Sequence, residues 1–163
     1  MPSIQINGVI HQRQLTARAC WYTCLQMAVR YYENATQSSH TNLQSPENFP
    51  HMQQRFASGG NPSWAEWRQW AEQCGFTPLN LTPNKDGIYQ FLSQYGPIVY
   101  SGTWGNTFDG HVVVITGIDT DANTAYIDDP LEQNAPVSKD VNTYFAQLTQ
   151  TLWENPLFVY QVC

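Results

Sequence analysis

Residues 14–27 read Gln-Leu-Thr-Ala-Arg-Ala-Cys-Trp-Tyr-Thr-Cys-Leu-Gln-Met (QLTARACWYTCLQM) and place two cysteines one helical turn apart, behind a glutamine. Apolar residues recur with a helical period through this segment and beyond it, at positions 20, 21, 24, 25, 27, 28, 31 and 32. An apolar face this broad is typical of a helix that is buried in a protein core. We therefore predict a core helix over residues 16–33.

The two cysteines differ in the chemistry that their positions allow. A thiol is a nucleophile only as the thiolate, which a helix N-terminus and a nearby histidine both stabilise. Cys20 lies near the start of the predicted helix and meets the first condition. Cys24 lies one turn deeper, where the helix dipole is weaker and water is excluded, so we expect a core residue there. Burial as a small apolar side chain is the alternative for Cys20.

The rest of the chain predicts an α+β fold, in which helices come first and strands later. Ser63 and Glu66 form a capping box for a helix that Gly75 ends, and Trp64, Trp67 and Trp70 recur along it, a spacing that favours core packing over a ligand site. The polar stretch 34–62 predicts a long surface excursion, either mobile or facing substrate, with a short helix near 50–57. We expect further helices at 86–95 and 138–153, the latter capped by Ser138, and antiparallel strands at 97–104, 111–119, 124–130 and 157–162.

Length, charge and hydropathy limit the functional classes. A chain of 163 residues has the usual size of one domain, so we expect a single domain over 1–163. Seven Lys and Arg against thirteen Asp and Glu give a net charge of −6, with no basic run, which argues against nucleic-acid binding. No segment resembles a membrane span or a secretory signal peptide, so we expect a soluble chain without membrane partners. We interpret most of the four cysteines (20, 24, 74 and 163) as free thiols.

Three residues can complete a thiol active site around Cys20. His111 follows a glycine-rich stretch and begins a predicted strand, where a side chain can face a cleft. Asp129 comes eighteen residues later at the end of the next strand, and two adjacent antiparallel strands bring such positions side by side. Gln14 lies just upstream of Cys20, and its amide together with the Cys20 N–H can donate two hydrogen bonds to an oxyanion.

Each of these residues also has an ordinary structural interpretation. His111 alone could be a core histidine with a satisfied hydrogen bond, and Asp128-Asp129-Pro130 alone could mark a turn. A metal site is disfavoured because no second Cys/His pair at short spacing partners Cys20 and Cys24. The other histidines, His11, His40 and His51, lie in polar, irregular context, and we expect them at the surface.

Together these motifs resemble the papain-like cysteine peptidases. The order Gln14, five residues, Cys20-Trp21, then GHVVVITGID and YIDDP resembles most the bacteriocin-processing, double-glycine peptidase domains of peptide exporters, and related secreted bacterial effector proteases. Their nucleophile helix has the pattern Cys-x-x-x-Cys-Leu-x-Met, which stands here at 20–27. Trp21 departs from the glycine usual in exporter peptidases and matches papain instead. The resemblance covers about residues 12–33 and 96–130.

The resemblance implies a papain-like fold and a cysteine endopeptidase with Cys20 as nucleophile, His111 as base and Asp129 or the adjacent Asp128 as the orienting group. Gln14 is implied as the oxyanion donor, and no cofactor or metal is implied. Partners would be a protein or peptide substrate, cut after Gly-Gly, and an immunity or inhibitor protein covering the active site. The kinship also suggests a secreted effector or interbacterial toxin delivered by a dedicated system. An amidase, deamidase or acyltransferase, and a catalytically idle peptide-binding domain, are the alternatives.

Overall fold

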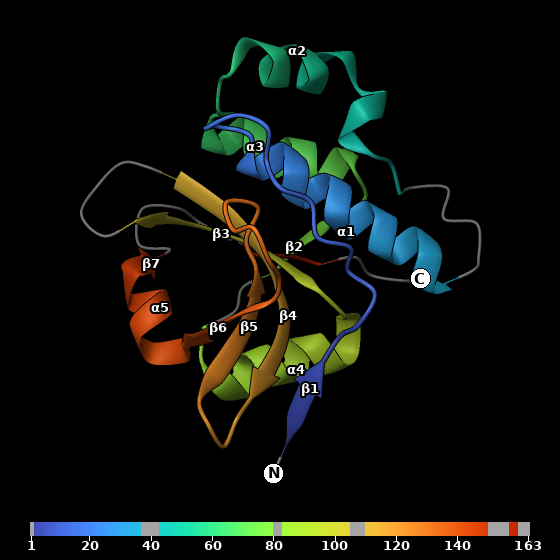
Figure 1. The fold of residues 1–163 in the computed structure, drawn as a ribbon. Coiled ribbons are helices and arrows are strands. Elements are labelled where there is room, and N and C mark those ends of the chain that lie inside the picture. The colour runs from blue at the N-terminus through green and yellow to red at the C-terminus, as the bar shows by residue number, and fades with distance from the viewer. Residues whose placement is uncertain (1, 37–42, 80–82, 105–109, 150–156, 160–163) are drawn as a thin grey trace.

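The chain folds as an antiparallel sheet between two groups of helices (Figure 1). This computed structural model describes residues 2–36, 43–79, 83–104, 110–149 and 157–159. The elements are β1 (Ser3–Gln5), α1 (Cys20–Thr36), the 3-10 turn η1 (Pro46–Asn48), α2 (Pro50–Ser58), α3 (Trp64–Gln73), β2 (Thr77–Leu79), α4 (Lys85–Tyr95), β3 (Ile98–Trp104), β4 (Gly110–Asp119), β5 (Thr124–Asp128), β6 (Val137–Asp140), α5 (Val141–Gln147), β7 (Leu148–Thr149) and β8 (Leu157–Val159).

The predicted core helix is present, and it begins at Cys20 instead of residue 16. Its first turn is fixed by the Ala19 carbonyl, which accepts hydrogen bonds from the backbone N–H of Thr23 at 3.0 Å and from its hydroxyl at 2.9 Å. Residues from Cys20 to Val29 are all buried, which agrees with the broad apolar face in the sequence. The later start places Cys20 in the first turn of α1.

The sheet has the strand order β2-β8-β3-β4-β5-β6, with β1 added to β4 and β7 to β3, and every pairing is antiparallel. The three central strands match the predicted ones at 97–104, 111–119 and 124–130 to within two residues. In their register His111 lies opposite Gly102, and Asp128 lies opposite Val114. The predicted strand 157–162 is present at Leu157–Val159, and its remainder lies outside the described residues.

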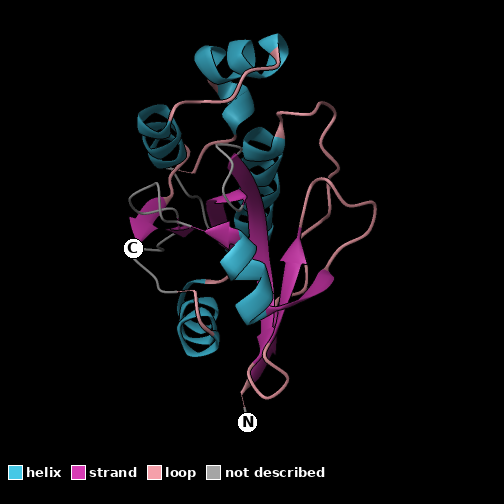
Figure 2. Cartoon of the chain, turned by 90° about the vertical axis from the view of Figure 1, so that its left-hand side faces the viewer, coloured by secondary structure: helices cyan, strands magenta, loops and turns pink. Residues whose placement is uncertain are grey.

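Helices cover both faces of the central strands (Figure 2). Along β3 and β4, Val99, Val112 and Val114 pack with α1 and α3, whereas the alternate residues, such as Tyr100 and Val113, pack with α4 and α5. This explains why 98–100 of β3 and 112–115 of β4 are continuous apolar runs, instead of alternating with polar residues. The strand phase therefore fixes which side chains of β4 face α1.

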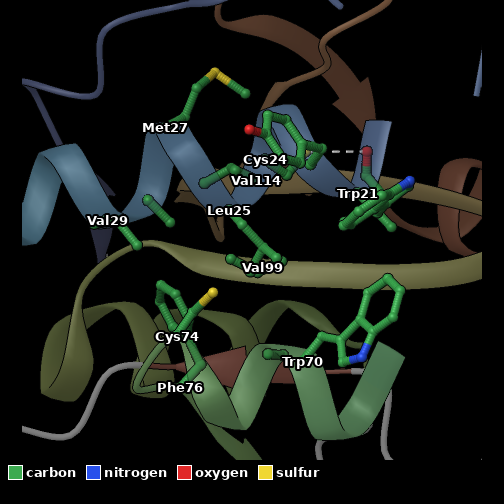
Figure 3. Close-up of a cluster of buried hydrophobic side chains, with 14 of the residues drawn as sticks. Trp21, Cys24, Leu25, Met27, Val29, Trp70, Cys74, Phe76, Val99 and Val114 are labelled. Carbon is green, nitrogen blue, oxygen red and sulfur yellow. Dashed lines mark hydrogen bonds between the residues drawn. The ribbon is translucent and has the colours of Figure 1, made fainter. Parts of the chain in front are cut away.

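The predicted capping box of α3 is confirmed. The Ser63 hydroxyl accepts from the Glu66 N–H at 3.2 Å, and the Glu66 carboxylate accepts from the Ser63 N–H at 2.9 Å. Figure 3 shows Trp70 of α3 below the sheet strand β3, with Trp21 of α1 above it. The two indole rings are 5.4 Å apart, so α1 and α3 are joined by aromatic packing.

The excursion after α1 contains the expected short helix, as α2 at Pro50–Ser58. This segment is less superficial than its polar composition predicts, because Leu43 and Met52 are buried in the same core as α1. Residues 37–42 of the excursion lie outside the described residues. The helix predicted at 86–95 is also present as α4, and it ends at Gly96, whose φ of 100° and close approach to the Tyr32 side chain both require glycine.

The helix predicted over 138–153 with Ser138 as its cap is wrong in its start and its cap. Ser138 lies in β6 and pairs with Tyr126 of β5, so pairing with the sheet overrides the local capping signal. The helix α5 begins at Val141, and the Asp140 carboxylate caps it by accepting from the Thr143 N–H at 2.9 Å. It ends at Gln147, directly before β7, and residues 150–153 lie outside the described part.

Candidate active site

Cys20 is the first residue of the 17-residue helix α1. The N–H groups of the first turn have no acceptor within the helix, and they and the helix dipole favour a negative charge there. The side chain of Cys20 is 7% exposed and borders a cleft, so a substrate can reach it while the core surrounds the rest of the residue. The fold thus places Cys20 at a helix start, and its role as a thiolate remains a prediction.

His111 lies near the start of β4, opposite Gly102 of β3, and lines the cleft together with Cys20. Its ring is 4% exposed, and Nε2 is 2.9 Å from Asp129 Oδ1. Because Nε2 is engaged by the carboxylate, Nδ1 is the nitrogen left for the hydrogen bond with the Cys20 side chain. The Trp104 ring stacks on the imidazole, with centroids 5.6 Å apart and planes at 25°, which restrains its rotation.

The protonation of His111 is governed by opposing effects. Burial of the ring lowers its pKa, but hydrogen bonds with Asp129 and Cys20 and the charges of both partners outweigh this and raise the pKa to about 9. The imidazolium is therefore stable at neutral pH next to the thiol. Such a perturbed histidine in a cleft is typical of a catalytic site.

The two adjacent aspartates have different partners. Asp129 Oδ1 accepts from the Leu131 N–H at 2.9 Å in addition to its contact with His111. Asp128 instead contacts His11, with His11 Nδ1 and Asp128 Oδ1 2.6 Å apart. The geometry therefore joins Asp129, and not Asp128, to the Cys20–His111 pair.

The expectation that His11 is a surface residue is wrong. Its side chain is 18% exposed, and Nε2 donates to the Glu132 carbonyl at 2.7 Å while Nδ1 faces Asp128. The fold returns the N-terminal segment to the turn after β5, more than a hundred residues along the chain, and so gives the ring two polar partners. His51 is exposed as expected, and His40 lies outside the described residues.

Gln14 lies on the same returning segment, with its backbone N–H donating to the Pro130 carbonyl at 2.9 Å. Its side-chain Nε2 donates to the Thr16 carbonyl at 2.7 Å, and its Oε1 is buried without a hydrogen-bond partner among the described residues. A primary amide has two N–H donors, so one remains after the bond to Thr16. Gln14 is absent from the cleft lining that the described residues form.

Cys24 and Cys74 are both free and fully buried. The Cys24 thiol donates to the Val112 carbonyl at 3.2 Å, and burial, then the neighbouring Cys20, raises its pKa well above the ordinary value. Burial raises the pKa of Cys74 to about 12. Both thiols therefore stay protonated, and Cys163 lies outside the described residues.

A cleft of about 230 Å³ opens at Cys20 and His111, and tryptophans form much of its wall. Trp64 and Trp67 come from the start of α3, and Trp21 comes from α1. A Cβ built on Gly110 would lie 3.8 Å from the Trp64 ring, so the cleft is narrow between β4 and α3. The remaining lining residues are Asn61, Pro62, Ser63 and Val112.

The sequence did not predict the contacts that hold the start of α3 beside the cleft. Arg55 of α2 forms two 2.9 Å hydrogen bonds with the Glu66 carboxylate, donates to the Asn61 carbonyl at 2.9 Å and lies over the Trp70 ring. These contacts fix the loop before α3, which lines the cleft. The capping box was a usable signal for Glu66, but no local pattern pairs it with Arg55.

The described residues contain neither a candidate metal site nor a candidate membrane-spanning helix. They contain no cluster of three His, Cys, Asp or Glu side chains suited to hold a metal ion. Of the helices within the same ranges, none is long and apolar enough to cross a membrane.

Comparisons with known proteins find solved structures of similar fold. A C39-like peptidase from Bacillus anthracis matches with a TM-score of 0.65 and 16% identity, over 100% of this chain and 99% of its own. The peptidase domain of Streptococcus ComA, a bifunctional ABC transporter involved in quorum sensing, matches with a TM-score of 0.56 and 13% identity, over 94% and 97% of the two chains.

A third structure, from a study of the mite allergens Blo t 1 and Der p 1, has a TM-score of 0.55 and 11% identity, over 94% of this chain and 66% of its own. At these identities the structures establish the fold, which is papain-like. No curated protein sequence matches significantly. Residues 3–149 match the family described as papain-like cysteine protease AvrRpt2. The chain therefore belongs to this family of papain-like cysteine proteases, and it is a cysteine peptidase.

Proposed function

We propose that the chain hydrolyses peptide bonds through a triad of Cys20, His111 and Asp129. The observation that carries this proposal is the connected arrangement of the helix-start thiol, the imidazole and the carboxylate, with Asp129 Oδ1 2.9 Å from His111 Nε2. Asp129 orients the ring and stabilises its protonated form. The same carboxylate is held by its own turn through Leu131 N–H.

The reaction follows from these positions. The Cys20 thiolate attacks the substrate carbonyl carbon, and His111 then gives its proton to the leaving amine as the C–N bond breaks. The acyl group stays on sulfur as a thioester. Water attacks this thioester while neutral His111 accepts a proton from it, which releases the carboxylic acid and restores the thiolate–imidazolium pair.

A thiol-directed probe tests the proposed nucleophile directly. Iodoacetamide at about pH 6, well below an ordinary thiol pKa of roughly 8.5, alkylates only an activated thiolate at a useful rate. We expect one modification, at Cys20, with Cys24 and Cys74 untouched. Absence of rapid labelling at Cys20 would remove the basis of the proposed mechanism.

The oxyanion that forms during attack needs two donors, and we propose the Cys20 backbone N–H and the second N–H of the Gln14 amide. Support comes from the position of Cys20 at the helix start and from the Gln14–Thr16 bond, which orients the amide. We expect Gln14→Ala to lower kcat by about 10²- to 10³-fold, because one oxyanion donor is lost. Steady-state kinetics measures kcat, and iodoacetamide alkylation of Cys20 is measured beside it. If kcat falls and the alkylation rate stays the same, Gln14 acts on the oxyanion. If the alkylation rate falls as much as kcat, Gln14 acts instead in activating the thiol.

We also propose that the peptidase cleaves its substrate after Gly-Gly. The sequence places two rings near the thiol and the imidazole, Trp21 directly after Cys20 and Trp104 in the stretch before His111. Trp21 borders the cleft, but Trp104 stacks on His111 and is not part of the described lining, whereas Trp64 narrows the cleft from α3. A rigid aromatic wall rejects an added side chain by overlap, which discriminates more sharply than filling an apolar pocket.

We predict that the ends of proteolysed peptides show this preference. Mass spectrometry of a digested proteome should find new termini after Gly-Gly in exposed loops. Trp64→Ala should widen the preference to larger residues, while Trp64→Phe, which keeps a ring in place, should retain it. Termini scattered over bulky residues for the unaltered chain would refute the Gly-Gly preference, and cuts confined to peptidoglycan stems would indicate an amidase.

We further propose that the peptidase acts as a bacterial effector or toxin delivered into another cell, opposed by an immunity or inhibitor protein that covers the cleft. The resemblance to secreted effector proteases supports this role. Expression of the active chain in a candidate target cell should impair growth, and expression of Cys20→Ala should not. Equal toxicity of both chains would show that proteolysis is not the cause.

A further inference from the structure

His11 forms an ion-pair contact with a second buried aspartate beside the proposed triad. The Asp128 side chain is 3% exposed and contacts His11 Nδ1 at 2.6 Å, while His11 Nε2 donates to the Glu132 carbonyl at 2.7 Å. These two partners flank Asp129 in the sequence, one directly before it and one three residues after it. His11 therefore spans the turn that presents the Asp129 carboxylate to His111.

We propose that His11 is a positioning residue that locks this turn and so holds Asp129 in line with His111. The inference rests on the proposed triad. Asp129 is otherwise held only within its own turn, by the Leu131 N–H on its carboxylate and by the Glu132 N–H on its carbonyl at 3.0 Å, among the contacts of the described residues. His11 supplies one link from outside the turn, through Asp128 and the Glu132 carbonyl.

The segment that carries His11 is itself fixed to the nucleophile helix. Gln12 donates through its amide to Gln26 of α1 at 2.7 Å, and Arg30 of α1 donates to the Gln12 amide oxygen at 2.7 Å. The Gln14 N–H donates to the Pro130 carbonyl. Residues 11–14 thus join α1, which carries Cys20, to the turn that carries Asp129, and they set the relative position of two proposed triad members.

Loss of His11 would leave a buried carboxylate without its partner and release one side of the turn. We expect His11→Ala to lower kcat by up to about 100-fold, because small misplacements of a catalytic group have effects of this size. KM should change little, since His11 is not among the described residues that line the cleft. A His11→Asn variant, whose amide N–H can replace Nδ1–H toward Asp128, should recover part of the rate.

Alkylation of Cys20 by iodoacetamide at about pH 6 separates positioning from general destabilisation. The titratable groups acting on His111 are Cys20 from α1 and Asp129 from the turn after β5, so a displaced Asp129 lowers the pKa of His111 and weakens its support of the thiolate. We expect slower low-pH alkylation in His11→Ala, partial recovery in His11→Asn and no change in His51→Ala, a control at an exposed histidine bonded to Gln73. Labelling of Cys24 and Cys74 would report unfolding.

The outcomes separate a failure of the proposed triad from a failure of the proposed role of His11. If the unaltered chain lacks rapid low-pH labelling at Cys20, the proposed function fails. If it labels rapidly and folded His11→Ala labels and turns over equally fast, the triad stands and the role of His11 is overturned. A loss that His11→Asn does not relieve at all, in a folded protein, also overturns the positioning role.

Discussion

Replacing Cys20 by alanine is expected to abolish peptide hydrolysis and iodoacetamide labelling while the chain remains folded. Removal of a nucleophile lowers turnover by roughly 10⁴- to 10⁶-fold, because the remaining groups only bind and polarise the substrate. Cys20 borders the cleft, so removing its sulfur leaves no large internal cavity. Turnover measured against the unaltered chain, with circular dichroism as a check of folding, gives the result.

Cys24→Ala is the matched control for this experiment, because it removes the same atom one helical turn deeper. Cys24 is fully buried, donates to the Val112 carbonyl and has a raised pKa, so it packs as a protonated core side chain. We expect this variant to keep its turnover and to lose about 1 kcal/mol in the free energy of unfolding. Urea denaturation measures that loss.

The reverse result would contradict the assignment of the nucleophile. If Cys24→Ala folded with its normal stability but had no activity, and Cys20→Ala still turned over substrate, the helix-start thiol would be a core residue. The helix-start position and the hydrogen bond to His111 would then have no catalytic consequence. Mass spectrometry of the alkylated peptides gives an independent answer, since it locates the modified cysteine directly.

Much of the fold was predictable because its signals are local. The apolar period over 16–33 and the apolar runs of β3 and β4 each require burial on a defined face, and Ser63 with Glu66 marks a helix start through contacts three residues apart. The structure also brings Cys20, His111 and Asp129 together, and the two adjacent strands predict the His111–Asp129 part of this arrangement. Their catalytic roles remain predictions.

The features that sequence could not supply depend on distant partners. His11 is a surface residue by context, and only the fold shows that it meets Asp128, 117 positions away. Ser138 has the residue type of a helix cap, but its backbone pairs with β5, and the cap role falls to Asp140. In both cases tertiary contacts override a local preference. The choice between Asp128 and Asp129 has the same origin.

His111→Ala should be as inactive as Cys20→Ala, because the thiolate loses its counter-charge and the leaving amine loses its proton donor. Asp129→Ala should retain more activity, with a loss between about 10²- and 10⁴-fold, since an orienting group is replaced in part by the remaining packing. Trp104, stacked on the imidazole, is one such restraint. Single-turnover rates on a peptide substrate measure the loss in each variant.

Asp128→Asn is the matched control at the adjacent position. Its amide keeps a hydrogen-bond contact with His11 available, and Asp128 has no contact with His111 among the described residues. We expect a smaller loss than at Asp129. A severe loss in this variant together with full activity in Asp129→Ala would move the orienting role by one residue.

The pH profile distinguishes an orienting carboxylate from one that only supports the fold. Hydrogen bonds with Asp129 and Cys20 raise the pKa of His111 to about 9, so the imidazolium persists below that pH and is lost as the pH rises through it. Asp129→Ala removes one raising contribution, so the pKa of His111 falls and the proton is lost at lower pH. The alkaline limb of kcat/KM should therefore move to lower pH in Asp129→Ala. If the alkaline limb stayed at the same pH while the maximum kcat/KM fell, Asp129 would support the site without acting on His111.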